Sequence, residues 1–211
     1  LVSVSCNGPV LRWEIATGRN ELVFDASPDT VAAAALSTDG GTLALGTQDG
    51  TVRLLEFDSM RSVDLSPSHS SGVMAVSFSP DGRLLATAGK GCDVYLWDVG
   101  TGQLAVAPIE RPWRTRSLVF NAESTVLAVA GSNRCISFFD VATGSVVDRI
   151  KAYFPDNTSM AMHGDLLVSA SYDGALKVWD VNQGYLVTTL LGHSKGPPFL
   201  ALSRDGELLV S

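Results

Sequence analysis

The stretch VYLWDV, from Val94 to Val99, places a run of large apolar side chains directly before an acidic residue. Four other stretches repeat this order, namely VLRWEI, VRLLEF, ISFFDV and LKVWDV. The acids that end the five runs are Glu14, Glu56, Asp98, Asp140 and Asp180, and successive members are 42, 42, 42 and 40 residues apart. A spacing this regular predicts a structural unit repeated along the whole chain.

Turn-forming residues keep the same period. A pair rich in Asn, Asp or Gly precedes each run: Asn7-Gly8, Asp49-Gly50, Gly91-Cys92, Asn133-Arg134 and Asp173-Gly174. Such residues tolerate the backbone angles that tight hairpins need. Each period therefore holds four short apolar segments separated by turns, which predicts four antiparallel strands and an all-β fold. Four-stranded units repeated in this way are the blades of a β-propeller.

The repeat also predicts how the chain is divided. We expect one propeller domain over residues 1–211, with units at about 1–24, 25–66, 67–109, 110–150, 151–191 and 192–211. The opening LVSVSCNG aligns with LVSASYDG at Leu167, and the final ELLVS also falls in a second strand. We therefore expect an open arc of about five blades that is a fragment of a larger propeller.

The segment VAAAALS, from Val31 to Ser37, tests this interpretation. Alanine favours a helix, but the repeat aligns this segment with the innermost strand of the unit. Small side chains suit a strand close to a crowded central axis. We give the register more weight than the propensity, and predict a strand.

Composition excludes several classes of protein. A net charge of −7 disfavours general nucleic-acid binding. No apolar run approaches the roughly 20 residues that span a bilayer, so no membrane association is expected. Three cysteines do not describe a disulfide framework, which favours a reducing compartment: the cytoplasm, with the nucleus as the alternative.

The period, the four strands per unit and two dipeptides resemble those of the WD-repeat proteins. Trp97-Asp98 and Trp179-Asp180 match the Trp-Asp signature, and Gly192-His193 matches the Gly-His signature. The resemblance implies a hydrogen-bonded group in each blade that joins a His before the first strand, a Ser or Thr on the second, a turn Asp and the Trp. The matching positions here are Ser3, Trp13, His69, Thr87, Trp97, Ser169, Asp173, Trp179 and His193.

Internal comparison supports the hydroxyl partner of the tryptophan. A Ser or Thr stands ten residues before Trp13, Trp97 and Trp179, whereas an apolar residue stands ten before Leu55 and Phe139. This is expected, because a buried indole N–H without a partner costs about 1–3 kcal/mol. The third unit has Gly91 where the turn Asp is expected, and Asp93 is the candidate substitute.

Nothing in the sequence indicates catalysis. His69 and His193 share one repeat position, and the recurring acids are explained as turn or network residues. The sequence has no phosphate-binding loop, dinucleotide fingerprint or nucleophile elbow. We therefore expect no enzyme activity, no cofactor and no metal site.

Candidate binding residues lie where loops break the repeat pattern. The resemblance implies binding at the face that carries the loops before the first strands and the turns between second and third strands. The candidates there are Gln48, Lys90, Arg111, Trp113, Arg114, Arg116, Tyr153, Phe154 and Tyr172. Trp and Arg are enriched at interface hot spots, and an arginine cluster suits an acidic or phosphorylated peptide. The alternative is that Trp113 packs over a blade edge where the His is missing, and the arginines are solvated.

Three functions follow, in order of preference. The first is a non-catalytic protein-interaction scaffold or adaptor. The second is a sensor or regulatory region of a multidomain signalling protein, such as a nucleotide-switch ATPase or a kinase. The third is a propeller hydrolase or dehydrogenase, for which the predicted inner strands supply almost no acid–base residues.

Overall fold

The computed structural model describes residues 1–6, 9–25, 30–110, 113–152, 157–171, 173–194, 199–203 and 206–211, with no account of the Asn157 and Thr158 side chains. These residues form six antiparallel sheets, numbered here as blades 1 to 6 in chain order. None of the described residues is helical, so the all-β prediction is confirmed. The described residues contain no helix with the length and hydrophobicity needed to cross a membrane.

The strands of the first three blades are as follows. Blade 1 contains β1 (Val2–Val4), β2 (Pro9–Trp13) and β3 (Asn20–Asp25). Blade 2 contains β4 (Val31–Leu36), β5 (Thr42–Thr47), β6 (Val52–Glu56) and β7 (Arg61–Asp64). Blade 3 contains β8 (Val73–Phe78), β9 (Leu84–Gly89), β10 (Asp93–Asp98) and an outer strand in two pieces, β11 (Gln103–Leu104) and β12 (Ile109–Glu110).

The remaining blades follow the same order. Blade 4 contains β13 (Thr115–Phe120), β14 (Val126–Gly131), β15 (Cys135–Asp140) and β16 (Val146–Lys151). Blade 5 contains β17 (Asn157–His163), β18 (Leu166–Ser171), β19 (Leu176–Asp180) and β20 (Tyr185–Leu190). Blade 6 contains β21 (Ala201–Leu202) and β22 (Leu209–Val210).

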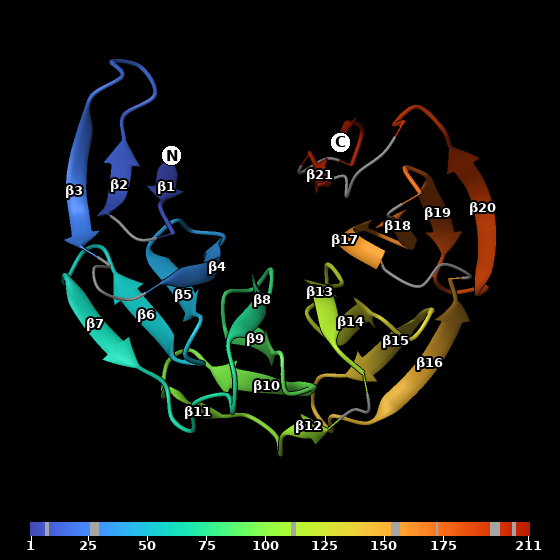
Figure 1. Ribbon diagram of the computed structural model, residues 1–211, viewed down its shortest axis with the longest axis horizontal. Coiled ribbons are helices and arrows are strands. Elements are labelled where there is room, and N and C mark those ends of the chain that lie inside the picture. Colours follow the sequence, from blue (N-terminus) through green and yellow to red (C-terminus); the bar gives the residue numbers. More distant parts are fainter. Residues whose placement is uncertain are drawn as a thin grey trace.

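The blades stand side by side around a central space (Figure 1). The first strands of the complete blades, β4, β8, β13 and β17, lie nearest the centre, and the outer strands β7, β16 and β20 form the rim. The arc remains open between blade 1 and blade 6. The predicted open arc of propeller blades is therefore confirmed.

The alanine-rich segment is a strand, as the register predicted. Val31–Leu36 forms β4 and pairs with β5, from Val31 opposite Thr47 to Leu36 opposite Leu43. Its neighbours are β5 in its own blade and β8 in the next. Pairing and burial at this inner position override alanine's helix propensity.

The core lies between blades rather than at one centre. Five clusters of buried apolar side chains each join two consecutive sheets. Between blades 2 and 3, for example, Val52 packs with Leu85 and Trp97, all of them inaccessible to solvent. Burial of each such side chain contributes about 1.5–3 kcal/mol, so the arc is stable only because neighbouring blades cover each other.

Strand pairing defines two faces of the arc. In blade 4, Thr115 at the start of β13 lies opposite Gly131 at the end of β14, and Val126 lies opposite Asp140 at the other end of the sheet. We call the face where the inner strands begin the top face. The face where they end, with the turns after the third strands, is the bottom face.

Candidate functional site

Blade 3 contains a buried chain of hydrogen bonds at its centre. The Trp97 indole N–H donates to Thr87 Oγ1 at 2.9 Å. The His69 ring bridges Thr87 Oγ1 and Asp93 Oδ2, each at 2.8 Å from one of its nitrogens. Asp93 thus takes the role expected of the turn Asp, from two residues beyond Gly91.

Burial favours the neutral form of His69 in this hydrogen-bonded network. Desolvation lowers the pKa of His69, and the hydrogen bond and charge of Asp93 offset this only in part. A neutral imidazole has one donor, so Nδ1–H donates to Asp93 and Nε2 accepts the Thr87 hydroxyl. The Thr87 oxygen is then free to accept the indole N–H, and every donor in the chain meets an acceptor.

The order Asp–His–Thr has the connectivity of a catalytic triad, but its surroundings give it a structural role. Thr87 is fully buried, and Trp97 occupies its oxygen. The Tyr95 ring stacks on His69 with centroids 4.3 Å apart and covers the imidazole. A nucleophile must reach its substrate, and this hydroxyl is enclosed on these sides.

Other blades carry parts of the same arrangement. Trp13 donates to Ser3 Oγ at 2.7 Å, and Trp179 donates to Ser169 Oγ at 2.9 Å. His193 contacts Ser211 Oγ of blade 6 at 2.7 Å, so it serves the blade that follows it. The Asp173 carboxylate accepts the Ala175 N–H within its turn. In blade 4, Val129 and Phe139 pack as apolar residues at the equivalent positions.

The predicted binding segment before β13 divides into packed and exposed residues. Trp113 is half-buried, and the Arg149 guanidinium from β16 lies 5.8 Å from its ring centroid. Arg114 is exposed, and its carbonyl accepts the Ser132 N–H at 3.1 Å. Arg116 is half-buried in β13, and its Nε atom is buried without a hydrogen-bond partner among the described residues.

The other described candidates lie in turns of the same face. Gln48 and Lys90 are exposed in the turns after β5 and β9. The Gln48 N–H donates to Thr30 and the Lys90 N–H donates to Gly72, each at 2.9 Å, so both turns contact the loop before the first strand of their own blade. The predicted residues Arg111, Tyr153, Phe154 and Tyr172 lie outside the described residues.

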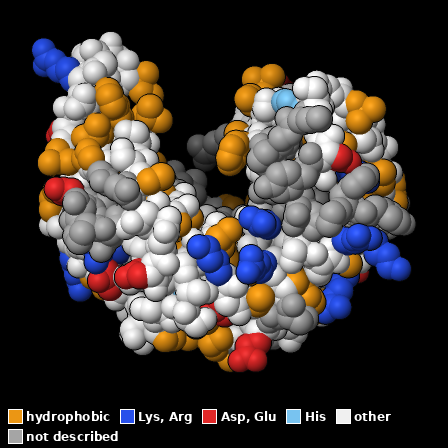
Figure 2. All heavy atoms as spheres, viewed as in Figure 1, with side chains coloured by type: hydrophobic (Ala, Val, Ile, Leu, Met, Phe, Trp, Pro, Cys, Tyr) orange, Lys and Arg blue, Asp and Glu red, His pale blue; other side chains and the backbone are white. Residues whose placement is uncertain are grey.

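One basic residue of this face was missed by the sequence analysis. Arg134 is exposed in the turn after β14, with a φ of 60°. Ser132, in the same turn, binds the Arg114 carbonyl. The place of Arg134 in the periodic turn pair was the available signal. Figure 2 shows Lys and Arg side chains gathered beside the central hollow, near β8 and β13.

The described residues give no support to a metal centre. Among them, no group of three or more His, Cys, Asp or Glu side chains is arranged to hold a metal ion. Cys6, Cys92 and Cys135 are free thiols in different blades.

Comparison with known proteins agrees with the blade structure. The profile of the WD domain, G-beta repeat, matches residues 60–98 and 155–180. The chain is 27% identical over 211 residues to telomerase protein component 1 of Rattus norvegicus. This alignment covers 93% of this chain and 8% of that protein. The chain is 32% identical over 163 residues to nuclear distribution protein PAC1 of Arthroderma otae, in an alignment that covers 68% of this chain and 34% of that protein.

A third relative is WD repeat-containing protein VIP3 of Arabidopsis thaliana, 27% identical over 186 residues that cover 80% of this chain and 58% of that protein. The chain spans 8%, 34% and 58% of the lengths of these three relatives. The matched segments contain β7 to β10 and β17 to β19. From its periodic sequence, its four-stranded blades and these similarities, the chain belongs to the WD-repeat family.

Proposed function

We propose that this chain is a non-catalytic protein-interaction scaffold whose top face binds an acidic or phosphorylated segment of a partner protein. The observation that carries the proposal is that several basic residues and one half-buried tryptophan lie in or beside the loops and turns of that face. We call these residues the top-face patch: Lys90, Trp113, Arg114, Arg116 and Arg134. The chain as a whole has a net charge of −7, so these residues stand out from their background.

The patch has the chemistry needed to recognise an anion. Arginine binds carboxylate and phosphate groups through paired N–H donors, and such charge-assisted bonds are about twice as strong as neutral ones. The side chains of Arg114 and Arg134 are exposed, so an anionic ligand can reach them from solvent. Trp113 adds an aromatic surface of the kind that anchors interfaces.

A scaffold role fits the use of the polar residues elsewhere. His69, Thr87 and Asp93 are committed to one another inside blade 3. The carboxylates of Asp98 and Asp140 accept N–H groups in their own turns. The second function predicted from the sequence is a regulatory region of a multidomain signalling protein. It concerns other domains of such a protein, and it stays a prediction.

The test is a binding comparison between two charge reversals. Arg114→Glu is expected to weaken binding of a fluorescent peptide with one phosphoserine between glutamates, and to remove protein partners recovered by pull-down. Arg61→Glu makes the same charge change at an exposed residue at the bottom-face end of β7, and is the matched control. Equal binding by both variants, with both folded, would refute the patch.

Trp113→Ala separates the two interpretations of the tryptophan. If Trp113 is a binding anchor, the variant loses peptide affinity while its unfolding midpoint stays near that of the parent chain. If Trp113 only packs against Arg149, the variant loses stability and retains affinity once folded at lower temperature.

A further inference from the structure

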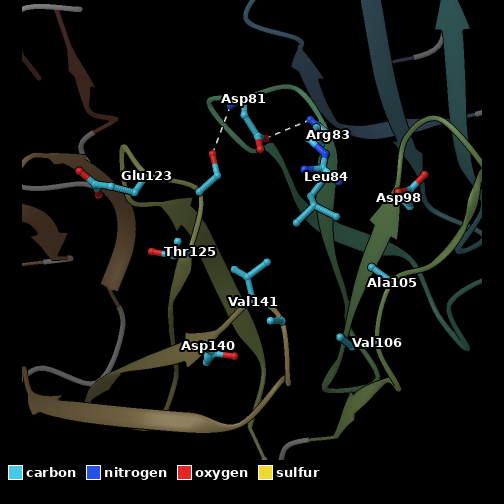
Figure 3. A pocket seen from close by; sticks show the side chains of 12 residues that line it. Asp81, Arg83, Leu84, Asp98, Ala105, Val106, Glu123, Thr125, Asp140 and Val141 are labelled. Atoms are coloured by element: carbon cyan, nitrogen blue, oxygen red, sulfur yellow. Dashed lines mark hydrogen bonds between the residues drawn. The ribbon is translucent and has the colours of Figure 1, made fainter.

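The bottom face carries a groove between blades 3 and 4 with a volume of about 460 Å³ (Figure 3). Its apolar lining includes Leu84, Val106 and Val141, and its acidic lining includes Asp81, Asp98 and Asp140. Figure 3 shows residues of blade 3 on one side, including Arg83 and Ala105, and residues of blade 4 on the other. The groove is thus an opening at the edge of an inter-blade core.

An interruption in the outer strand accompanies this opening. Blade 3 has β11 ending at Leu104 and β12 starting at Ile109. The Ala105 N–H still donates to the Leu96 carbonyl at 2.8 Å, and the chain leaves the ladder after it. Val106, from this segment, packs against the core between blades 3 and 4 and also lines the groove. It lies against Gly144, where an added Cβ would come within 3.5 Å of Val106 Cγ2.

The equivalent openings at the two neighbouring boundaries are smaller. Between blades 2 and 3, β7 is continuous, Leu65 is 2% exposed, and the remaining volume is about 60 Å³. Between blades 4 and 5 the volume is about 250 Å³. The repeat alone therefore does not produce a groove of this size, and the interrupted strand distinguishes the blade 3–4 boundary.

The groove is negatively charged at neutral pH. The Thr101 N–H and hydroxyl hold the pKa of the Asp98 carboxyl below its ordinary value, and the Thr143 hydroxyl and N–H do the same for the pKa of Asp140. Both carboxylates use Oδ1 for these bonds. Arg83 is the only cationic residue among the lining residues described.

We propose that this groove binds an extended peptide segment of a partner protein in which a lysine or arginine alternates with aliphatic residues. The aliphatic side chains, and the methylene stem of the basic one, cover Leu84, Val106 and Val141. The cationic end lies near Asp98 and Asp140. Charge complementarity selects this occupant, because an acidic peptide would bring like charges together in a confined space.

This proposal is independent of the top-face patch. The two surfaces lie at opposite ends of the strands and carry opposite charge. A scaffold with both can hold an acidic segment and a basic segment at the same time.

The experiment uses fluorescence anisotropy with a labelled peptide of alternating valine and lysine. Asp98→Asn and Asp140→Asn remove charge, while the amide oxygen still accepts the turn N–H. Each is expected to weaken binding about two- to fivefold, as loss of one partly exposed ion pair does. Asp180→Asn is the matched control, because Asp180 accepts the Gln183 N–H at the same position of blade 5 and does not line the groove.

The outcomes separate cleanly. The groove is supported if the two groove variants bind more weakly while Asp180→Asn binds as the parent chain does. It is also supported if binding is lost when the peptide valines are replaced by serine. Equal losses in all three variants would mean general charge attraction, and unchanged or undetectable binding would equally overturn the proposal. The variant Arg114→Glu should bind this peptide as the parent chain does. A negative result for the top-face patch therefore leaves the groove result unaffected.

Discussion

Blades 3 and 4 have the same strand order but different interiors. Blade 3 holds His69, Thr87, Asp93 and Trp97 in one hydrogen-bonded chain. Blade 4 has Val129 where blade 3 has Thr87, and Phe139 where it has Trp97. The difference shows that ladder pairing and apolar contact between blades are sufficient to form a blade, and that the polar chain is an addition.

The two blades also differ two positions earlier on the third strand. Tyr95 of blade 3 stacks on His69, whereas blade 4 has the small Ser137 there. Ser137 lies opposite Arg149, and Arg149 lies over the Trp113 ring. Trp113 thus contacts the residue paired with Ser137, at the position where blade 4 lacks the strand aromatic of blade 3.

The largest expected effect is from Thr87→Val, which gives blade 3 the apolar second strand of blade 4. It leaves the Trp97 N–H and His69 Nε2 buried without partners, at a cost of about 2–4 kcal/mol in the free energy of unfolding. Urea unfolding at neutral pH measures it. The reverse exchange, Val129→Thr, should also destabilise, because Phe139 offers no donor. An unchanged free energy of unfolding in Thr87→Val would show that the hydrogen-bonded network does not stabilise blade 3.

The second effect is a pH dependence that His69 of blade 3 should supply. Burial lowers the pKa of His69 below its ordinary value of 6.5, so the unfolded chain takes up this proton first as pH falls. Stability is therefore full above about pH 6.5 and declines below it, by at most about 1.4 kcal/mol per pH unit for this group. Urea unfolding between pH 7.5 and 5.5 measures the slope, and His69→Gln should flatten it. A slope unaffected by that substitution contradicts the assignment.

The smallest effect is expected in blade 4, from Ser137→Ala. The Ser137 hydroxyl is fully buried and has no hydrogen-bond partner among the described residues. Its removal relieves an unpaired polar group, so the free energy of unfolding should change by less than about 0.5 kcal/mol or rise slightly. A loss above about 1 kcal/mol would reveal a partner for this hydroxyl.

The fold could be predicted from periodicity because five short apolar runs, each a weak signal by itself, share one register. That register placed VAAAALS correctly as a strand, against its helix propensity. Pairing each tryptophan with a hydroxyl ten residues earlier needed only the antiparallel geometry of two neighbouring strands, and Trp97 and Thr87 lie in such strands.

The surfaces were harder to predict, because they depend on departures from the repeat. Arg134 occupies an ordinary turn position, and its exposure beside the loop before β13 emerges only in three dimensions. The interruption between Leu104 and Ile109 reads in sequence as a regular apolar segment. Its consequence, a groove with Val106 in its wall, depends on packing between two blades.

The most direct test of the account is hydrogen–deuterium exchange of the chain with the phosphoserine peptide bound. Protection confined to the top face, around residues 113–116 and the turns at Lys90 and Arg134, is the predicted result. Protection of bottom-face turns near Asp98 and Asp140, with none at the top face, would contradict it.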